Sequence, residues 1–338
     1  MIFGFVATPT IADEVYSAPF WLPSGHLQTI YPAIYASKIQ VQYRRERWEL
    51  DDGDFMDVDW IDNKNTAIQD APTVVLFHGL EGSSKSHYAL ALMANLQSKG
   101  WRGVVVHFRG CSGENNRLPR AYFAGDSADI EMALSRVKKS VGNTPIYAVG
   151  VSLGGNALLK WLGESGDHAA EIIQAAAAVS APTDLAACGE ALDKGLNRWL
   201  YTPMFVKSMR PKALEKAHQF PGLLDEEKIK SASTIREFDT YVTAKLHGFK
   251  DADDYWAKNA SKPWLTSIKI PTLMLNAKND PFIPSESLPD ETMVSEMVKL
   301  DITDEGGHVG FLSGHFPGNN HWLPEHIIEY FQSVKYKN

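Results

Sequence analysis

The stretch that decides the fold spans residues 146–156 and reads Ile-Tyr-Ala-Val-Gly-Val-Ser-Leu-Gly-Gly-Asn. Its first half, residues 146–150, is a short apolar run of the kind that forms a buried β-strand. Residues 153–163 have a helical pattern, so a strand passes into a helix through one sharp turn that carries Ser152. Gly-x-Ser-x-Gly occurs by chance in roughly one chain of ten at this length, so the strand and the helix around it make it informative.

The glycines around Ser152 have a mechanical reason. The turn forces the Ser152 backbone into a strained conformation, and Gly150 and Gly154 avoid a clash because they have no side chain. The hydroxyl then stands clear at the carboxyl edge of the sheet, as a nucleophile requires. The N–H of Leu153 lies at a helix start, where unpaired donors and the helix dipole favour an anion. The alternative is a glycine-rich turn with an incidental serine.

Short apolar runs alternate with helical patterns on both sides of this turn. The predicted strands are bounded by Gly, Pro or Asn and comprise residues 74–77, 103–108, 146–150, 175–180 and 272–276. The predicted helices between them comprise residues 86–99, 127–139 and 153–163. Runs that are apolar throughout indicate strands covered on both faces. The alternation therefore predicts an α/β fold with a mostly parallel central sheet and helices on both faces.

Two segments fall outside this alternation. Residues 1–45 carry many aromatic side chains and are expected to pack on the core, followed by a predicted hairpin that turns at Gly53. Residues 182–263 read as helices without a strand, at 185–199, 203–209, 212–220 and 235–246. Because strands resume at Thr272, we interpret this interval as a helical lid inserted into a single domain of residues 1–338. Its aromatic side chains would line an apolar pocket, with ordinary helical packing as the alternative.

The composition narrows the classes of function. The 338 residues include 33 Lys and Arg against 41 Asp and Glu, a net charge of −8, and nucleic acid is therefore not an expected partner. With two cysteines, Cys111 and Cys188, neither a disulfide framework nor a Cys-x-x-Cys metal site is possible. We find no run of 18 apolar residues and no signal peptide pattern. We therefore expect a cytoplasmic protein without a stable membrane anchor.

A serine hydroxyl is a weak nucleophile at neutral pH, so it needs a base that an acid orients. With a turn of this kind, acid and base follow the serine along the chain in that order. Asp280 comes directly after the predicted strand 272–276, which places it at the carboxyl end of a strand. His308 lies on the glycine-rich loop 305–311, which can bring the imidazole to the same edge. We predict Asp280 as the acid and His308 as the base.

Other residues compete for these two roles. Asp184 also follows a predicted strand, residues 175–180, and stays open as an alternative acid. Asp304 is too near His308 in the sequence to be preferred. The remaining late histidines fall in or near the last helix, where packing and surface roles are more common; they are His315, His321 and His326.

An oxyanion hole needs a second N–H donor beside Leu153. Residues 77–83, Phe-His-Gly-Leu-Glu-Gly-Ser, follow the first predicted strand of the core and can supply this second donor. We place the donor on the N–H of Leu80, with Gly79 leaving room for the backbone to pass close to the substrate. We expect His78 to hold this loop through hydrogen bonds, with a direct part in the chemistry as the alternative.

The loop at residues 107–114 brings two further candidates to the same edge. Arg109 is expected to pair with a loop carboxylate or carbonyl, with an acidic substrate as the alternative partner. Cys111 reads as a small buried residue. The histidines lack His-x-x-x-His spacing with acidic partners in helical register, so neither a metal site nor a cofactor is predicted.

Four segments together resemble the YheT-like branch of the α/β-hydrolase superfamily, also called the AB-hydrolase-4 family. They are residues 78–83, 107–114, 149–156 and 306–311, and residues 19–29 are similar to the N-terminal segment of that family. The resemblance covers residues 19–330. It implies an α/β-hydrolase fold and a Ser-Asp-His relay at Ser152, Asp280 and His308. Some eukaryotic relatives act on lipids and carry a membrane anchor, which we do not find here, so a membrane lipase role is not carried over.

These observations predict a serine carboxylesterase that cleaves small-molecule esters of small to medium acyl chain through an acyl-enzyme. An acyltransferase or a thioesterase would use the same serine and stays open as an alternative. Outside the enzymes, the alternative is a ligand-binding protein on the same scaffold. The sequence leaves the natural substrate and the oligomeric state open.

Overall fold

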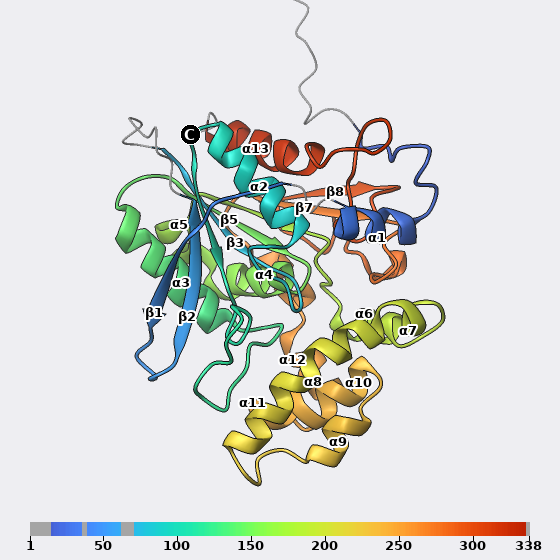
Figure 1. Cartoon of the computed structure of the whole chain (residues 1–338). Coiled ribbons are helices and arrows are strands. Elements are labelled where there is room, and N and C mark those ends of the chain that lie inside the picture. The colour runs from blue at the N-terminus through green and yellow to red at the C-terminus, as the bar shows by residue number, and fades with distance from the viewer. Residues whose placement is uncertain (1–14, 36–38, 62–70, 336–338) are drawn as a thin grey trace, which may run out of the picture.

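Eight strands form one mixed sheet in the computed structural model, which describes residues 15–35, 39–61 and 71–335 (Figure 1). The order across the sheet is β1-β2-β4-β3-β5-β6-β7-β8. β2 pairs antiparallel with β1 and β4, and the other neighbours are parallel. The strands are β1 (Arg44–Glu49), β2 (Phe55–Ile61), β3 (Thr73–Phe77), β4 (Arg102–Val106), β5 (Ile146–Val151), β6 (Ala175–Val179), β7 (Thr272–Ala277) and β8 (Val298–Thr303).

Helices cover both faces of this sheet, which confirms the predicted layers (Figure 1). One face is covered by α3 (Ser127–Val141) and α4 (Leu153–Ser165), and the other by α2 (His87–Ser98) and α13 (Trp322–Lys335). Side chains of β3 alternate between the two layers: Val75 packs in the α3 and α4 layer, and Val74 in the α2 and α13 layer. Both are fully buried, which explains why the strand is apolar from Val74 to Phe77 without alternation.

The predicted strands of the core correspond to β3 to β7, with ends that differ by one or two residues. The predicted hairpin is β1–β2, and it turns at Gly53 with a φ of +87°. β8 has no counterpart among the predicted strands. It lies at the edge of the sheet, where Lys299 and Asp301 interrupt its apolar pattern. Edge strands tolerate such residues because one side of the strand is unpaired.

Between β6 and β7 the chain forms a group of helices without a strand (Figure 1). They are α6 (Leu185–Leu192), α7 (Asn197–Leu200), α8 (Thr202–Gln219), α9 (Glu226–Ser231), α10 (Ile235–Phe238), the π-helical turn η4 (Asp239–Thr243), α11 (Ala244–His247), α12 (Ala252–Asn259) and the 3₁₀ turn η5 (Lys262–Ser267). We call residues 182–263 the insertion. The remaining short elements are η3 (Gly166–His168), α5 (Ala169–Ile172) and η6 (Ser285–Ser287).

The insertion differs in detail from the prediction. The helix expected over residues 185–199 divides into α6 and α7, because Gly195 adopts a φ of +52° between them. The two helices expected at 203–209 and 212–220 form one helix, α8, which continues through Pro211. The short helices α9 and α12 are not predicted. Asp225 and Asp251 cap them by accepting backbone N–H bonds, a local signal that hydrophobic periodicity does not contain.

The N-terminal segment packs on the core within its described part. Helix α1 (Gly25–Tyr35) forms there, and no helix was predicted for it. Tyr16 is buried against Phe311 and Trp322, with ring centroids 5.2 and 4.8 Å apart. Residues 1–14 and 36–38 of the segment predicted at 1–45 lie outside the described residues. In the described part of the chain, no helix is both long and apolar enough to cross a membrane.

Candidate active site

Three loops bring Ser152, Asp280 and His308 together at the carboxyl edge of the sheet. Ser152 forms the turn between β5 and α4, Asp280 follows β7, and His308 follows β8. The Nε2 atom of His308 lies 2.9 Å from the Oγ of Ser152, and its Nδ1 lies 2.8 Å from Oδ2 of Asp280. When Nδ1 carries the proton and donates it to Asp280, Nε2 can accept the proton of the serine hydroxyl.

The turn at Ser152 is too tight for side chains on its glycines. Ser152 adopts a φ of +53°, a strained conformation for a residue with a side chain. A Cβ atom on Gly150 would lie 2.5 Å from the carbonyl oxygen of Gly154. A Cβ atom on Gly154 would lie 2.5 Å from the carbonyl oxygen of His78. Glycine at both positions therefore lets β5, α4 and the loop after β3 meet at the serine.

The surroundings of Asp280 hold the imidazole of His308 in one orientation. The Asp280 side chain is completely buried. Its Oδ1 accepts a hydrogen bond from the N–H of Phe282 at 2.8 Å, which leaves Oδ2 for the histidine. The Phe282 ring lies against the imidazole, with 4.3 Å between ring centroids. The Asp280 carboxylate and the apolar ring thus fix which nitrogen faces Ser152.

Helix α1 braces the loop that carries His308. The Oγ1 of Thr29 accepts a hydrogen bond from the N–H of His308 at 2.8 Å. The side-chain oxygen of Gln28 accepts one from the N–H of Gly306 at 2.9 Å. Both side chains are buried although they are polar. The sequence analysis missed these two positioning residues.

The same helix also contacts the loop that carries Asp280. Asn279 donates its side-chain amide to the oxygen of Gln28 at 2.9 Å and accepts the N–H of Gly307 at 2.9 Å. A Cβ atom on Gly25 would lie 1.9 Å from the backbone oxygen of Asn279, so α1 approaches this loop as closely as the chain allows. The available signal was Gly25 together with two polar residues in an otherwise apolar segment. Sequence alone does not say which loop such a segment contacts.

The loop after β3 sets the direction of the Leu80 N–H. The carbonyl of Gly79 accepts hydrogen bonds from Nδ1 of His78 at 2.8 Å and from the N–H of Gly82 at 2.9 Å. The carbonyl and the N–H of a trans peptide point in opposite directions, so the Leu80 N–H points away from these two donors. The loop runs directly beside the serine, because a Cβ atom on Gly79 would lie 3.1 Å from Cβ of Ser152.

His78 belongs to the framework of this loop. It is fully buried, and its Nε2 accepts a hydrogen bond from the N–H of Phe108 at 3.1 Å. The ring proton therefore sits on Nδ1, the atom that donates to Gly79. Burial lowers the pKa of His78 to about 3, which keeps the ring neutral near pH 7. Both ring nitrogens bind backbone groups, as expected for a residue that holds the loop.

Leu80 and Leu153 both line the pocket beside Ser152. Leu153 is the first residue of α4, where a backbone N–H has no partner within its own helix. The backbone N–H groups on either side of Leu80 are engaged: that of Gly79 binds the Tyr88 hydroxyl, and that of Glu81 binds the Tyr122 hydroxyl. The two predicted oxyanion donors thus belong to the two backbone segments that meet at the serine.

Arg109 pairs with carboxylates, as expected. It binds both oxygens of Asp129 at 2.8 Å, and its Nη1 also contacts Asp52 at 2.8 Å and Asp54 at 3.0 Å. Its side chain is buried, so this network ties the hairpin β1–β2 to α3 and to the loop after β4. Cys111 is buried, and burial raises the pKa of its thiol to about 12. Among the described residues, no group of three or more His, Cys, Asp or Glu side chains could hold a metal ion.

The competing acids have structural partners elsewhere. Asp184 caps α6 by accepting the N–H of Ala187 at 3.1 Å. Asp304 is exposed and pairs with Lys278 at 2.7 Å.

The competing histidines lie outside the arrangement. His326 packs in α13, where its Nε2 lies 2.8 Å from Asp301 and its ring stacks on Trp322. His315 and His321 are exposed at the surface. Packing and surface roles therefore account for the late histidines other than His308.

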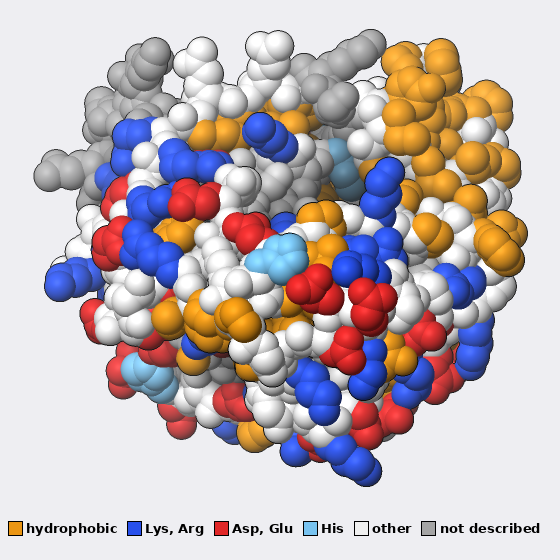
Figure 2. All heavy atoms as spheres, turned by 60° about the horizontal axis from the view of Figure 1, so that its bottom comes forward, with side chains coloured by type: hydrophobic (Ala, Val, Ile, Leu, Met, Phe, Trp, Pro, Cys, Tyr) orange, Lys and Arg blue, Asp and Glu red, His pale blue; other side chains and the backbone are white. Residues whose placement is uncertain are grey.

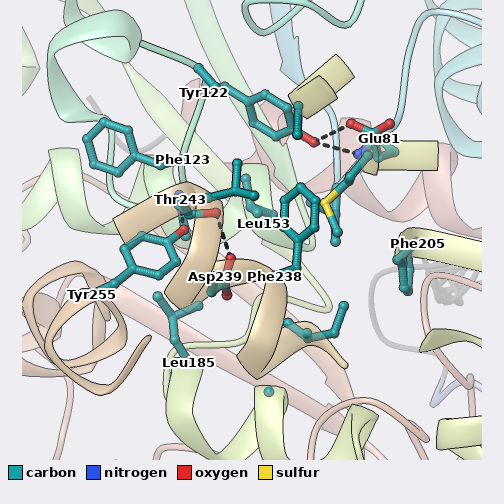
Figure 3. A pocket seen from close by; sticks show the side chains of 18 of the residues that line it. Glu81, Tyr122, Phe123, Leu153, Leu185, Phe205, Phe238, Asp239, Thr243 and Tyr255 are labelled. Atoms are coloured by element: carbon teal, nitrogen blue, oxygen red, sulfur yellow. Dashed lines mark hydrogen bonds between the residues drawn. The ribbon is translucent and has the colours of Figure 1, made fainter. Parts of the chain in front are cut away.

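An apolar pocket extends from Ser152 into the insertion (Figure 3). Leu153 and Tyr122 line it from the core, and Leu185, Phe205 and Phe238 line it from the insertion. Both walls line the same pocket, so a bound molecule would contact both.

Two polar groups interrupt this apolar lining. The carboxylate of Glu81 accepts the Tyr122 hydroxyl and the amino group of Lys212, both at 2.8 Å. On the insertion side, Asp239 accepts hydrogen bonds from Thr243 and Trp256, each at 2.8 Å. Burial raises the pKa of Asp239 to about 6. These groups give the pocket a charged side near the core and a titratable side at its far wall.

The comparisons with known proteins agree with this architecture. Residues 72–315 match the model of the family described as alpha/beta hydrolase fold. The chain is 38% identical over 330 residues to the protein named "Putative esterase YheT" of Escherichia coli, covering 96% of each chain. It is 34% identical over 329 residues to the human protein named "Phospholipase ABHD3", covering 96% of this chain and 80% of that protein.

Solved structures show the same fold at low sequence identity. The Pyrococcus furiosus esterase Pf2001 superposes with a TM-score of 0.52 at 18% identity, over 88% of this chain and 91% of that one. Est1E of Butyrivibrio proteoclasticus gives a TM-score of 0.54 at 15% identity, over 86% and 99%. The sheet order, the turn at Ser152 and the extent of these matches lead to one assignment: the chain belongs to the α/β-hydrolase family, in its YheT-like branch.

Proposed function

We propose that the protein is a serine carboxylesterase that acts on small-molecule esters. The observation that carries the proposal is the continuous chain of hydrogen bonds from Ser152 through His308 to Asp280, at 2.9 and 2.8 Å. The relatives named as an esterase and as phospholipases support ester hydrolysis as the class of reaction. The apolar pocket beside the serine supports an apolar acyl or alcohol group in the substrate.

In the proposed reaction, His308 removes the proton of the Ser152 hydroxyl as the oxygen attacks the ester carbonyl. Asp280 holds the imidazole and stabilises the imidazolium that forms. The imidazolium then protonates the departing alcohol, which leaves an acyl group on Ser152. A water molecule attacks the acyl-enzyme with His308 again as the base. The acid is released, and the serine regains its proton.

The developing negative charge falls on the former carbonyl oxygen. The N–H groups of Leu80 and Leu153 would donate to it. The fixed direction of the Leu80 peptide, set by His78, supports this role, since preorganised donors stabilise a transition state without reorganising. The helix start at Leu153 adds a favourable dipole for the anion.

The insertion, residues 182–263, acts as a lid over a single catalytic domain in this proposal. Leu185 and Phe238 line the pocket and would contact an acyl chain of small to medium length. The alternatives that keep Ser152 as nucleophile are acyl transfer to an alcohol and hydrolysis of a thioester. They differ in the acceptor or in the leaving group and need the same hydrogen-bonded chain.

The test is hydrolysis of p-nitrophenyl esters from acetate to palmitate by the wild type and by Ser152→Ala. The variant should lose activity by a factor of about 10⁴ to 10⁶. Ser208→Ala is the matched control, since Ser208 is exposed on α8, and its activity should equal that of the wild type. The best chain length would give the size of the pocket.

Three results would redirect the proposal. Equal turnover by Ser152→Ala would contradict the mechanism. Labelling of Ser152 by a serine-directed phosphonate, without hydrolysis of any ester, would favour acyl transfer or a thioester. No labelling of Ser152 would favour a ligand-binding protein.

A further inference from the structure

Large hydrophobic side chains gather on the surface formed by α1, α7 and the first turn of α8. Figure 2 shows hydrophobic side chains at the upper right, on the side of the molecule where α1 and α7 lie in Figure 1. Six exposed residues of these elements and of the loops beside them define what we call the apolar rim: Phe20, Ile34, Leu196, Trp199, Met204 and Phe316. Their exposed fractions lie between 58% and 86%. Single exposed hydrophobic residues are ordinary, but a cluster of this kind marks an interaction surface.

Contacts between rings hold the parts of the rim together. His26 of α1 stacks on Tyr201 at the start of α8, with centroids 5.8 Å apart, and its Nδ1 lies 3.0 Å from the Tyr201 hydroxyl. Trp21, next to Phe20, packs edge-on against Phe316 with centroids 5.4 Å apart. The N-terminal segment therefore joins the insertion to the loop that carries Phe316, although these segments are far apart in the sequence.

The rim and the pocket share a wall. In the first turn of α8, Met204 is exposed on the rim, while the next residue, Phe205, lines the pocket. Tyr201 packs against Phe282 with centroids 4.6 Å apart, and Phe282 in turn lies against the His308 imidazole. A path of apolar contacts thus runs from the exposed surface to the candidate catalytic histidine.

The charges around the rim differ from those of the rest of the chain. Residues 15–35 contain no Asp, Glu, Lys or Arg. From residue 194 to residue 214 every charged side chain is basic, although the whole chain has a net charge of −8. Of these five basic residues, Lys194 and Lys207 flank the rim. Arg198 and Arg210 bind the backbone oxygens of Ser233 and Ala232, and Lys212 pairs with Glu81 at the other end of α8. Lys194 and Lys207 are exposed and lie two and three residues from Leu196 and Met204 in the sequence, and Lys194 also pairs with Glu190.

We propose that the apolar rim binds the surface of anionic lipid bilayers. Aromatic and aliphatic side chains would enter the boundary between head groups and acyl chains, while the flanking lysines would contact lipid phosphates. A second copy of the chain fits the surface less well, because a symmetric contact would set the same basic residues against each other. Binding through a few side chains is reversible, and it needs no membrane-spanning segment.

This inference deepens the proposed function and rests on it for the use made of the pocket. It assigns the substrate class to amphiphilic lipid esters that pass from the bilayer along Tyr201 and Phe205 to Ser152. Lipid binding itself requires no catalysis. Lipid binding can therefore be measured on a variant that cannot hydrolyse esters.

The experiment is sedimentation of the full-length Ser152→Ala protein with vesicles of phosphatidylcholine, with and without phosphatidylglycerol. We expect binding to vesicles that contain phosphatidylglycerol and weaker binding to pure phosphatidylcholine. Phe20→Ser with Trp199→Ser should reduce the affinity about tenfold for each aromatic side chain removed. Leu196→Ala should reduce it by a smaller factor. Leu223→Ala, a matched leucine that is exposed in the insertion outside the rim, should leave it unchanged.

Each outcome decides between the proposals. No binding to either vesicle, or binding that the rim variants leave unchanged, would overturn the rim proposal. Sedimentation velocity of the free protein tests the other occupant: a dimer that Trp199→Ser dissociates, without vesicle binding, would assign the rim to a second copy.

Rim variants that keep Ser152 should hydrolyse soluble p-nitrophenyl butyrate as fast as the wild type does. The dependence of this hydrolysis on Ser152 tests the proposed function separately.

Discussion

The two walls of the pocket are built in different ways. The core wall consists of loops at the carboxyl ends of β3, β4, β5 and β7, beside the loop after β8 that carries His308. At the turn after β5, Gly150 and Gly154 leave no room for a side chain. The wall from the insertion consists of helices with an apolar cluster of their own, which includes Ala213, Ile229 and Phe238. The candidate catalytic residues belong to the core, and the insertion supplies much of the apolar surface of the pocket. The comparison indicates that reaction and substrate choice can vary separately.

Polar contacts of α8 help to join the two walls. Lys212 on α8 pairs with Glu81, the residue after the candidate oxyanion donor, at 2.8 Å. Lys216, one turn further along α8, donates to the backbone oxygens of Asn116 and Leu118 in the loop after β4. These contacts place the insertion relative to the core, and they lie at one end of α8 while the apolar rim lies at the other.

The largest effect should come from the core wall. Asp280→Asn keeps the shape of the side chain but removes the charge that stabilises the imidazolium of His308. We expect kcat on a p-nitrophenyl ester to fall by about 10⁴. Asp184→Asn, at the alternative acid, should change activity little, since Asp184 caps α6. The assignment would reverse if Asp184→Asn were the inactive variant.

A second effect should appear in the insertion and should change stability. Burial raises the pKa of Asp239 to about 6, whereas an aspartate in an unfolded chain titrates near 4. Between these values the folded protein binds the proton more tightly, so stability falls as the pH rises from about 4 to 6. In Asp239→Asn the amide oxygen accepts the Trp256 N–H and the amide nitrogen donates to the Thr243 hydroxyl oxygen, so both partners stay bonded while this pH dependence is removed.

At pH 7.5 the Asp239→Asn variant should be more stable than the wild type by about 2 to 3 kcal/mol, and near pH 4 the two should be equal. Urea unfolding at both pH values measures this difference. The exposed Asp253→Asn is the control and should leave the pH dependence unchanged. An equal stability of wild type and Asp239→Asn at pH 7.5 would show that the buried carboxyl has an ordinary pKa.

A smaller effect should follow from the brace between the N-terminal segment and the core wall. Thr29→Val removes the oxygen that accepts the His308 N–H and keeps the shape of the side chain. We expect kcat for ester hydrolysis to fall about tenfold because the imidazole is displaced, while KM changes little. Thr29→Ser should restore most of the activity because it returns the hydroxyl. Equal kcat for Thr29→Val and the wild type would assign Thr29 to packing alone.

Much of the core wall could be predicted from the sequence, because its signals are local. A buried parallel strand is apolar at most positions, and β3, β5, β6 and β7 are buried throughout, with Thr73, Thr272 and Asn276 as their polar exceptions. The turn at Ser152 needs glycines within a few residues, and they are visible in the chain. Chain order then led to Asp280 and His308, which lie at hydrogen-bonding distances from each other and from the serine.

The insertion was less predictable because its helices obtain their stability from one another. Its interval and helical character follow from the missing strands. The extent of α8 through Pro211 and the short helix α12 do not, since they depend on packing and on single capping residues. Gln28 and Thr29 were missed for a related reason. Their partners, Gly306 and His308, lie almost the whole length of the chain away.

The sequence by itself determined the order of strands and helices, the turn that exposes Ser152, and the family. These properties rest on hydrophobic period, on glycine conformations and on motifs, all of which are written within short windows of the chain. Only the tertiary structure decided which aspartate faces His308, that α1 braces both loops, and that exposed aromatic side chains from three distant segments form the apolar rim. Contacts between distant segments depend on how the layers pack, and no local pattern contains them.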